Sequence, residues 1–290
     1  MSVIKNRDGE YTSTNESQEV VLGFLYKTVP GRMLLKVLTK PFVSKVAGIY
    51  MNSFLSTGLI KIFIKNHNIN LKEYEKCRYR SYNEFFTRKI KKDKRVINRD
   101  PHAFISPCDS KLSVYEINDK NIFHIKGSAY TLADLLDGDE IYKEFYGGYC
   151  MIFRLTVDDY HRYCYIDDGT KGENYFIPGE LHTVNPIALE HYNIYKRNCR
   201  EYTVLNTKHF GKVVQVEVGA MMIGRIKNHH GKHAFKRGEE KGMFEFGGST
   251  TVLLVKKDQI QVDADLLENS KENIETIIKL GEQIGYKINA

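Results

Sequence analysis

The sequence predicts an α+β protein in which a helical N-terminal layer packs on a mainly antiparallel β core and a C-terminal helix closes the chain. Apolar residues recur at helical spacing within residues 20–65, whereas the chain after Pro101 breaks into short β-rich runs separated by Gly, Asp and Asn. Few helical patterns interrupt those runs, which favours an antiparallel core over a parallel one. The chain thus divides into a flexible tail (1–19), a helical and basic region (20–100) and a β-rich domain (101–290).

Composition excludes several classes of protein. Hydrophobic residues make up 42% and charged residues 27% of the 290 positions, which supplies a sizeable core and excludes wholesale disorder. The five cysteines are odd in number and form no C-x-x-C pair, which argues against a disulfide scaffold and a zinc ribbon and favours a reducing compartment. The polar N-terminus lacks the apolar centre of a signal peptide.

The chain's net charge of +7 is concentrated near the N-terminus. Residues 20–65 contain seven basic and no acidic side chains, and one helical face is expected to carry Met51, Phe54, Leu55, Gly58, Leu59, Ile62 and Phe63. A basic amphipathic helix is typical of a membrane interface, although a layer packed on the protein's own core with solvated lysines gives the same pattern. The uncharged run 46–60 is too short and polar to span a bilayer, and Pro30 and Pro41 should divide the segment.

Two further segments complete the organisation. Residues 265–281 are predicted to form the closing helix, with Leu266, Leu267, Ile274, Ile277 and Ile278 on its apolar side. The second basic stretch, 78–99, lacks a recognisable nucleic-acid reader motif and is interpreted as a solvated helix end and loop, so no nucleic-acid partner is expected.

Four loops carry residues suited to catalysis: Asp109 in SPCD, His161 in DDYHR, His182 in PGELHTVNP, and Ser249 after two glycines in FGGST. Each also suits an ordinary turn. An Asp, a His and a Ser on separate loops match the composition of a catalytic triad, which geometry alone identifies. The serine does not lie in G-x-S-x-G, so a nucleophile elbow is disfavoured. His229, His230 and His233 have no acid at ligand spacing, and no metal site is predicted.

Taken in order, these segments resemble the phosphatidylserine decarboxylases. The matching blocks are 82–88 (YNEFFTR), 106–109 (SPCD), 159–162 (DYHR), 178–185 (PGELHTVN), 218–220 (VGA) with 223–224 (IG), and 248–250 (GST). Each block alone is weak, but six in the correct order are highly specific, and together they cover most of the chain.

The resemblance implies a self-processing enzyme that makes its own cofactor. Ser249 would attack the carbonyl of Gly248, and elimination and hydrolysis would leave a covalent pyruvoyl group in place of Ser249. The zymogen would yield a large chain, 1–248, that holds a small chain, 249–290. The pyruvoyl carbonyl would form a Schiff base with the amine of phosphatidylserine and absorb electrons as CO2 leaves, giving phosphatidylethanolamine.

The resemblance also implies roles for the candidate residues, with one departure. Asp109 would orient a His that activates Ser249, and His161 is the candidate for that base or for the later proton donor. Many family members carry a second His three residues after the first, where this chain has Cys164. Either His161 therefore does both jobs or His182 supplies the second imidazole, because a thiol is a poorer base near neutral pH.

Three functions stay open at this point. The first is a phosphatidylserine decarboxylase bound peripherally to the anionic cytoplasmic face of the cell membrane. The second is a processing-defective relative that is a non-enzymatic membrane protein, and the third is a pyruvoyl decarboxylase of a soluble amino acid. The acid-free apolar segment favours the first over the third, and the sequence is compatible with an oligomer.

Overall fold

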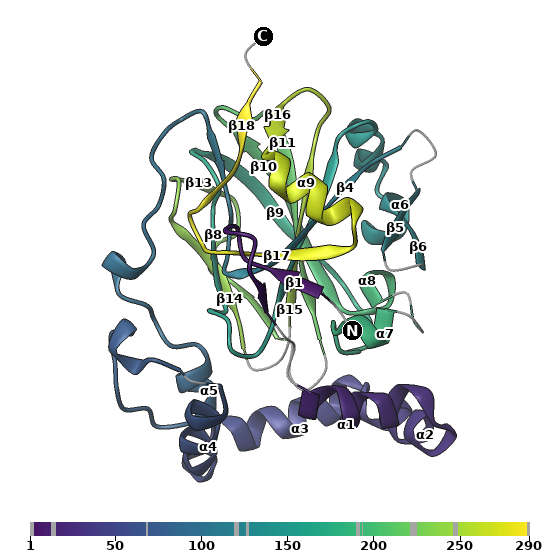
Figure 1. Cartoon of the computed structure of the whole chain (residues 1–290), viewed down its shortest axis with the longest axis vertical. Coiled ribbons are helices and arrows are strands. Elements are labelled where there is room, and N and C mark those ends of the chain that lie inside the picture. The colour runs from purple at the N-terminus through teal and green to yellow at the C-terminus, as the bar shows by residue number, and fades with distance from the viewer. Residues whose placement is uncertain are drawn as a thin grey trace.

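The structure is a computed structural model that describes residues 3–12, 16–67, 69–118, 122–125, 128–189, 192, 194–220, 225–245 and 249–288. A ten-stranded sheet forms its body (Figure 1), with strand order β13-β9-β10-β11-β15-β7-β4-β17-β1-β2. All neighbours in this sheet are antiparallel except the parallel pair β1–β17. The strands are β1 Val3–Lys5, β2 Tyr11–Thr12, β4 Ser110–Glu116, β7 Tyr149–Leu155, β9 Gly169–Ile177, β10 Arg200–Thr207, β11 Lys212–Gly219, β13 His233–Phe235, β15 Ser249–Val255 and β17 Ile274–Ile278.

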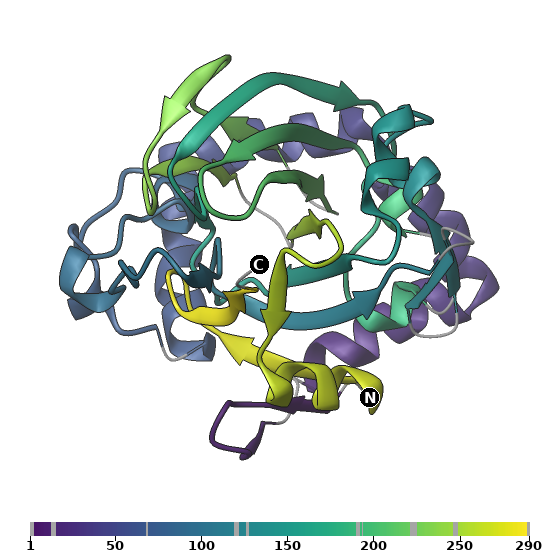
Figure 2. The same ribbon diagram turned by 90° about the horizontal axis from the view of Figure 1, so that it is seen from above.

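Three smaller sheets accompany the large sheet. Seen from above, the large sheet curves around the interior of the molecule (Figure 2). The first has the order β12-β14-β8, the second β16-β18-β3, and the third is the hairpin β5-β6. Their bounds are β3 Ala103–Ile105, β5 Ile122–Ile125, β6 Ser128–Thr131, β8 Arg162–Cys164, β12 Ile226–Asn228, β14 Glu240–Phe244, β16 Ile260–Val262 and β18 Gln283–Lys287.

Side-chain alternation along the strands builds two cores. In β11, Val214, Val216 and Val218 join an outer cluster with residues of the covering helices, as the sequence predicts. Val213 joins a second cluster, in which Phe153 of β7 and Leu253 of β15 are also buried. The large sheet is therefore apolar on both faces and needs cover on each.

Helices supply much of that cover. They are α1 Glu16–Lys27, α2 Val29–Leu38, α3 Pro41–Asn52, α4 Gly58–His67, α5 Tyr82–Phe86, α6 Leu132–Leu135, α7 Pro186–Leu189, α8 Ile194–Arg197 and α9 Ala264–Lys271, with 3-10 turns at Phe54–Thr57, Leu71–Glu73, Lys92–Lys94 and Glu140–Phe145. Figure 1 shows α1 to α4 as a layer across one end of the sheets. Pro30 and Pro41 lie in the first turns of α2 and α3, which confirms the predicted division. The α+β class is confirmed.

The predicted single apolar face over residues 51–63 is wrong. Ser53 adopts extended backbone angles and ends α3, so Met51 is buried while Phe54 and Leu55 are each 77% exposed. Within the described residues no single helix is long and apolar enough to span a membrane; Phe42–Asn52 and Phe54–His67 reach that length and composition together, with a 79° bend between them.

The predicted closing helix is correct only in its first half. Helix α9 ends near Asn273, which has a positive φ of 59°, and the chain continues as strands β17 and β18. The segment Ile274–Ile278 (IETII) is rich in β-branched residues, which favour a strand over a helix. The predicted flexible tail, residues 1–19, also differs from the structure, because its residues Val3–Lys5 form strand β1, which pairs with β17.

Candidate active site

Ser249 begins strand β15 in the middle of the large sheet. It pairs with Gly219 of β11 and Leu155 of β7. Its side chain is fully buried, and its Oγ has no hydrogen-bond partner among the described residues. Gly248, the other half of the predicted cleavage site, lies outside the described residues. An unpaired buried hydroxyl costs about 1–3 kcal/mol, so its presence calls for a functional reason.

His161, in the turn between β7 and β8, is a second buried group with an unpaired reactive atom. Its Nδ1 lies 3.0 Å from the carbonyl oxygen of Asp159 and donates to it, which leaves a lone pair on Nε2. Nε2 has no partner among the described residues, and the ring packs on Phe86. Burial lowers the pKa of His161 to about 4 against the opposing charge of Asp159. The imidazole is therefore neutral at pH 7 and able to accept a proton.

Asp159 fixes the turn that presents His161. Burial alone would raise the pKa of Asp159, but the ammonium of Lys111, 2.6 Å away, and the N–H of Thr156, 2.7 Å away, lower it to about 2. The carboxylate stays charged and ties residue 156 to strand β4.

Among the described residues, Asp109 makes no hydrogen bond or ion pair with His161 or His182, contrary to the predicted orienting role. Its buried carboxylate accepts hydrogen bonds from the guanidinium of Arg95 and from the N–H of Leu280, 2.9 Å away. Arg95 follows the 3-10 turn Lys92–Lys94 and belongs to the basic stretch 78–99, which was predicted to be solvated. Its guanidinium binds Asp109 at the position where the sequence predicted a histidine.

His182 is buried with both ring nitrogens engaged. Its Nε2 lies 3.1 Å from Glu180 Oε2, its Nδ1 lies 3.4 Å from the hydroxyl of Tyr26, and its ring stacks on Tyr192. Burial lowers its pKa, against the carboxylate of Glu180. These contacts direct the imidazole toward the helical layer.

Cys164, where the resemblance led us to expect a second His, is buried in β8. Burial raises the pKa of this thiol to about 12, so it is neutral at pH 7. Its backbone N–H donates to the carbonyl of Pro107, 2.9 Å away, which holds the SPCD turn against β8.

Backbone contacts gather these segments at one end of the sheets. The N–H of Phe244 donates to the carbonyl of His161, 2.9 Å away. The side-chain amide of Asn198 donates to the carbonyls of Gly219 and His182, at 2.7 and 2.8 Å. Since Gly219 pairs with Ser249, Asn198 links the His182 loop to the start of β15. Among the described residues, no hydrogen bond joins the side chain of Ser249 to His161, His182 or Asp109.

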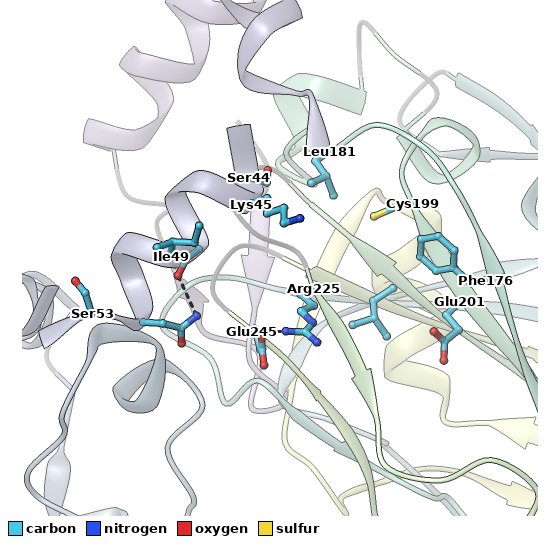
Figure 3. A pocket seen from close by; sticks show the side chains of 13 residues that line it. Ser44, Lys45, Ile49, Ser53, Phe176, Leu181, Cys199, Glu201, Arg225 and Glu245 are labelled. Atoms are coloured by element: carbon cyan, nitrogen blue, oxygen red, sulfur yellow. Dashed lines mark hydrogen bonds and ion pairs between the residues drawn. The ribbon is translucent and has the colours of Figure 1, made fainter. Parts of the chain in front are cut away.

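A pocket of about 870 Å³ opens beside this end of the sheets, between α3 and the strands (Figure 3). The buried hydroxyl of Ser44 lines it and has no partner among the described residues. Arg225 and Glu245 lie at its centre, 3.5 Å apart, and Glu245 is four residues before Ser249. The pocket lining also includes Lys45, Gly48, Ile49, Asn52, Ser53, Phe176, Leu181, Cys199, Glu201 and Ile226.

No local sequence pattern indicates this pocket, because its residues come from distant segments. The same holds for a fully buried ion pair, Lys241 with Glu217, whose atoms lie 2.8 Å apart. Glu217 pairs in register with Thr251, two residues after Ser249. The alternation of VVQVEV puts Gln215 and Glu217 on one face, which was the available signal for a polar patch beside β15.

The histidine loop also differs from its prediction. His230 and His233 meet Glu239, and their ligand atoms lie within 4.8 Å of one another. The acid comes from the next turn, six residues after His233, so consecutive ligand spacing did not reveal it.

Comparisons with known proteins identify the family to which this chain belongs. A family model described as phosphatidylserine decarboxylase matches residues 82–286. Phosphatidylserine decarboxylase proenzyme 2 of Clostridium acetobutylicum is 52% identical over 91% of both chains. The corresponding proenzymes of Clostridium kluyveri and Clostridium novyi are 41% and 38% identical over 96% and 99% of this chain, and over 96% and 100% of their own. The chain belongs to the phosphatidylserine decarboxylase family.

Proposed function

We propose that this protein decarboxylates phosphatidylserine to phosphatidylethanolamine with a pyruvoyl group made from its own Ser249. Family membership supports the reaction, and the observation that carries the proposal is the buried Oγ of Ser249, which has no hydrogen-bond partner among the described residues. A hydroxyl that served only the fold would be expected to find a partner. This atom fits a group that becomes part of the cofactor.

Maturation would proceed in three balanced steps. Ser249 Oγ attacks the carbonyl carbon of Gly248, and the peptide C–N bond breaks as an ester forms. Loss of the Cα proton expels the Gly248 carboxylate and leaves a dehydroalanine. Water then replaces its nitrogen, which leaves as ammonia.

The small chain 249–290 would stay bound after this cut. Strand β15 is paired along its whole length with β11 and β7, and β17 and β18 pair with strands of the large chain. A buried ion pair between Arg154 of β7 and Glu275 of β17, with contacts of 2.6 and 2.8 Å, adds a further link.

His161 is the residue we assign to proton transfer. Its neutral ring and unpaired Nε2 suit acceptance of the Ser249 proton and its return to the departing amine. His182 is less suited, because both its nitrogens already have partners. We therefore favour His161 for both jobs, with Asp159 rather than Asp109 fixing its orientation. In the mature enzyme the pyruvoyl carbonyl supplies an electrophile for the substrate amine and an electron sink, and His161 would return a proton to the decarboxylated carbon.

The helical layer is the proposed membrane contact. Of 21 exposed large apolar side chains among the described residues, 14 lie within residues 20–62, on the layer at one end of the molecule (Figure 1). The seven basic residues of this segment are also exposed and carry attraction to anionic lipid: Lys27, Arg32, Lys36, Lys40, Lys45, Lys61 and Lys65. A peripheral location at the cytoplasmic face of the cell membrane is consistent with this surface.

The pocket beneath α3 is the proposed headgroup site. Its cations, Lys45 and Arg225, suit the phosphate and carboxylate of phosphatidylserine, and Glu201 and Glu245 suit its ammonium. The unpaired hydroxyl of Ser44 supplies a further donor. Because α3 belongs to the layer that faces lipid in this proposal, a headgroup would enter while its acyl chains stay in the bilayer.

The testing experiment is release of CO2 from carboxyl-labelled phosphatidylserine in detergent micelles, with free serine in a parallel reaction. We expect release from the lipid alone, and an Arg225→Gln enzyme with a raised KM and little change in kcat. Release from serine at a comparable kcat/KM would favour a soluble amino-acid decarboxylase. A fully processed protein inactive on both substrates would contradict the proposal.

A further inference from the structure

A cluster of metal-binding side chains lies outside the proposed active site. His230 precedes β13, His233 begins that strand, and Glu239 directly precedes β14. Each side chain is about one-third exposed, at 28%, 30% and 32%. In the large sheet, three strands separate β13 from the β15 strand that begins with Ser249. We propose that His230, His233 and Glu239 form a binding site for one divalent transition-metal ion such as zinc.

The three candidate ligand atoms lie within 4.8 Å of one another. Glu239 Oε1 lies 2.7 Å from His233 Nε2 and 3.9 Å from His230 Nε2. The two imidazole rings are nearly parallel, at 9°, with centroids 3.9 Å apart. Ligand atoms bound tetrahedrally to zinc at about 2.0–2.1 Å lie about 3.3 Å from one another, between the two observed separations. Because the stacked rings direct their lone pairs within two parallel planes, the His233 ring would have to rotate about its side-chain bonds to complete the coordination.

Neighbouring groups hold these ligands in orientation. The hydroxyl of Tyr165 lies 3.2 Å from Nδ1 of His230 and fixes that ring, so that Nε2 points to the cluster. The second carboxylate oxygen of Glu239 accepts the backbone N–H of Lys236, 2.9 Å away, which leaves the first oxygen for the ion.

Two imidazole nitrogens and one carboxylate oxygen lie close enough to bind a single cation. A hydrogen bond between His233 and Glu239 satisfies only one of the two imidazoles, because Nε2 of His230 lies too far from that oxygen for a hydrogen bond. Two nitrogens and one carboxylate oxygen favour zinc, nickel or copper over magnesium or calcium. The ion would hold the loop between β12 and β13 against the start of β14, and a water molecule would occupy its fourth coordination position.

The test uses the full-length protein without a polyhistidine tag, stripped with chelator and titrated with zinc in a calorimeter. We expect one ion per chain and a rise in thermal unfolding temperature on binding. His233→Ala and Glu239→Gln should each weaken binding at least about tenfold. His229→Ala is the matched control, because His229 is adjacent in sequence but its Nε2 contacts Glu240, 2.7 Å away; this variant should bind as the parent does.

Chelator-treated variants should unfold at the parent's temperature, which separates loss of a ligand from loss of the fold. If either ligand variant is unfolded, His230→Asn replaces it. No saturable binding by the parent, or equal binding by the parent and the ligand variants, would overturn the proposal. Equal weakening in His229→Ala would likewise assign the ion elsewhere.

Discussion

Asp109 is bound by Arg95, whose Nε lies 2.8 Å from one carboxylate oxygen and 3.0 Å from the other. The pair joins the loop after α5 to the turn before β4, and the carboxylate also accepts the N–H of Leu280, which follows β17. Asp109 therefore links three segments around the candidate site through a cation rather than through a histidine.

Removing either partner of this pair should destabilise the protein. Arg95→Met leaves a buried carboxylate without its cation, and we expect a loss of roughly 3 kcal/mol in the free energy of unfolding. The double variant Arg95→Met with Asp109→Leu should lose less than the sum of the single changes. Urea unfolding of the four proteins measures this, and additive losses would contradict the pairing. If Asp109 instead orients a histidine, Asp109→Asn alone would block maturation.

The two histidine candidates should separate clearly. His161→Asn removes the unpaired Nε2, and we expect both chain cleavage and decarboxylation to fall by at least about a hundredfold. His182→Asn breaks contacts with Glu180 and Tyr26, so we expect a small loss of stability but normal maturation. A time course on denaturing gels measures both variants. Uncut His182→Asn beside normally cut His161→Asn would reverse the assignment.

Stability should fall as pH drops below about 6.5. Because the pKa of folded His161 is about 4 and lies below that of an unfolded histidine, the unfolded chain binds the proton more readily in this window. The stability that the neutral ring confers is present above pH 6.5 and is lost on acidification, by about 3 kcal/mol at pH 4. His161→Asn should show a shallower dependence in urea unfolding between pH 4 and 7. Parallel curves for the two proteins would contradict the assigned pKa.

Membrane binding should depend on the apolar helical layer. Phe54→Ser with Leu55→Ser removes two side chains that are each 77% exposed, and we expect at least about a tenfold weaker sedimentation with anionic vesicles. Val96→Ser is the matched control, because Val96 is 76% exposed but lies outside the layer. Binding of the parent should also weaken as salt rises. Equal binding of all three proteins would remove the layer from the membrane contact.

The sequence predicted what local pattern determines. Helical spacing and prolines located the N-terminal helices, alternation located β11, and six ordered motifs gave the family. The prediction failed where one residue interrupts a helix and changes which side chains are buried. Ser53 ends α3, so Phe54 is exposed while Met51 is buried. The prediction also failed where β-branched residues after Asn273 continue an apolar pattern in a strand.

The candidate site was predicted as a set of residues but not as a set of contacts. Ser249 and His161 are both buried with unpaired atoms, and no local pattern reports such burial. The partner of Asp109 lies in a charged loop, and the acid of the histidine cluster lies one turn beyond its strand. Pairings of this kind depend on how distant segments pack.

The most direct test of the account is the intact mass of the purified protein and of Ser249→Ala under denaturing conditions. We expect two chains for the parent, 1–248 and 249–290, with the small chain lighter by one ammonia than a chain that begins with serine. Ser249→Ala should give one uncut chain without decarboxylase activity. An intact parent chain would identify a processing-defective relative, and a cut Ser249→Ala protein would show that cleavage does not depend on this hydroxyl.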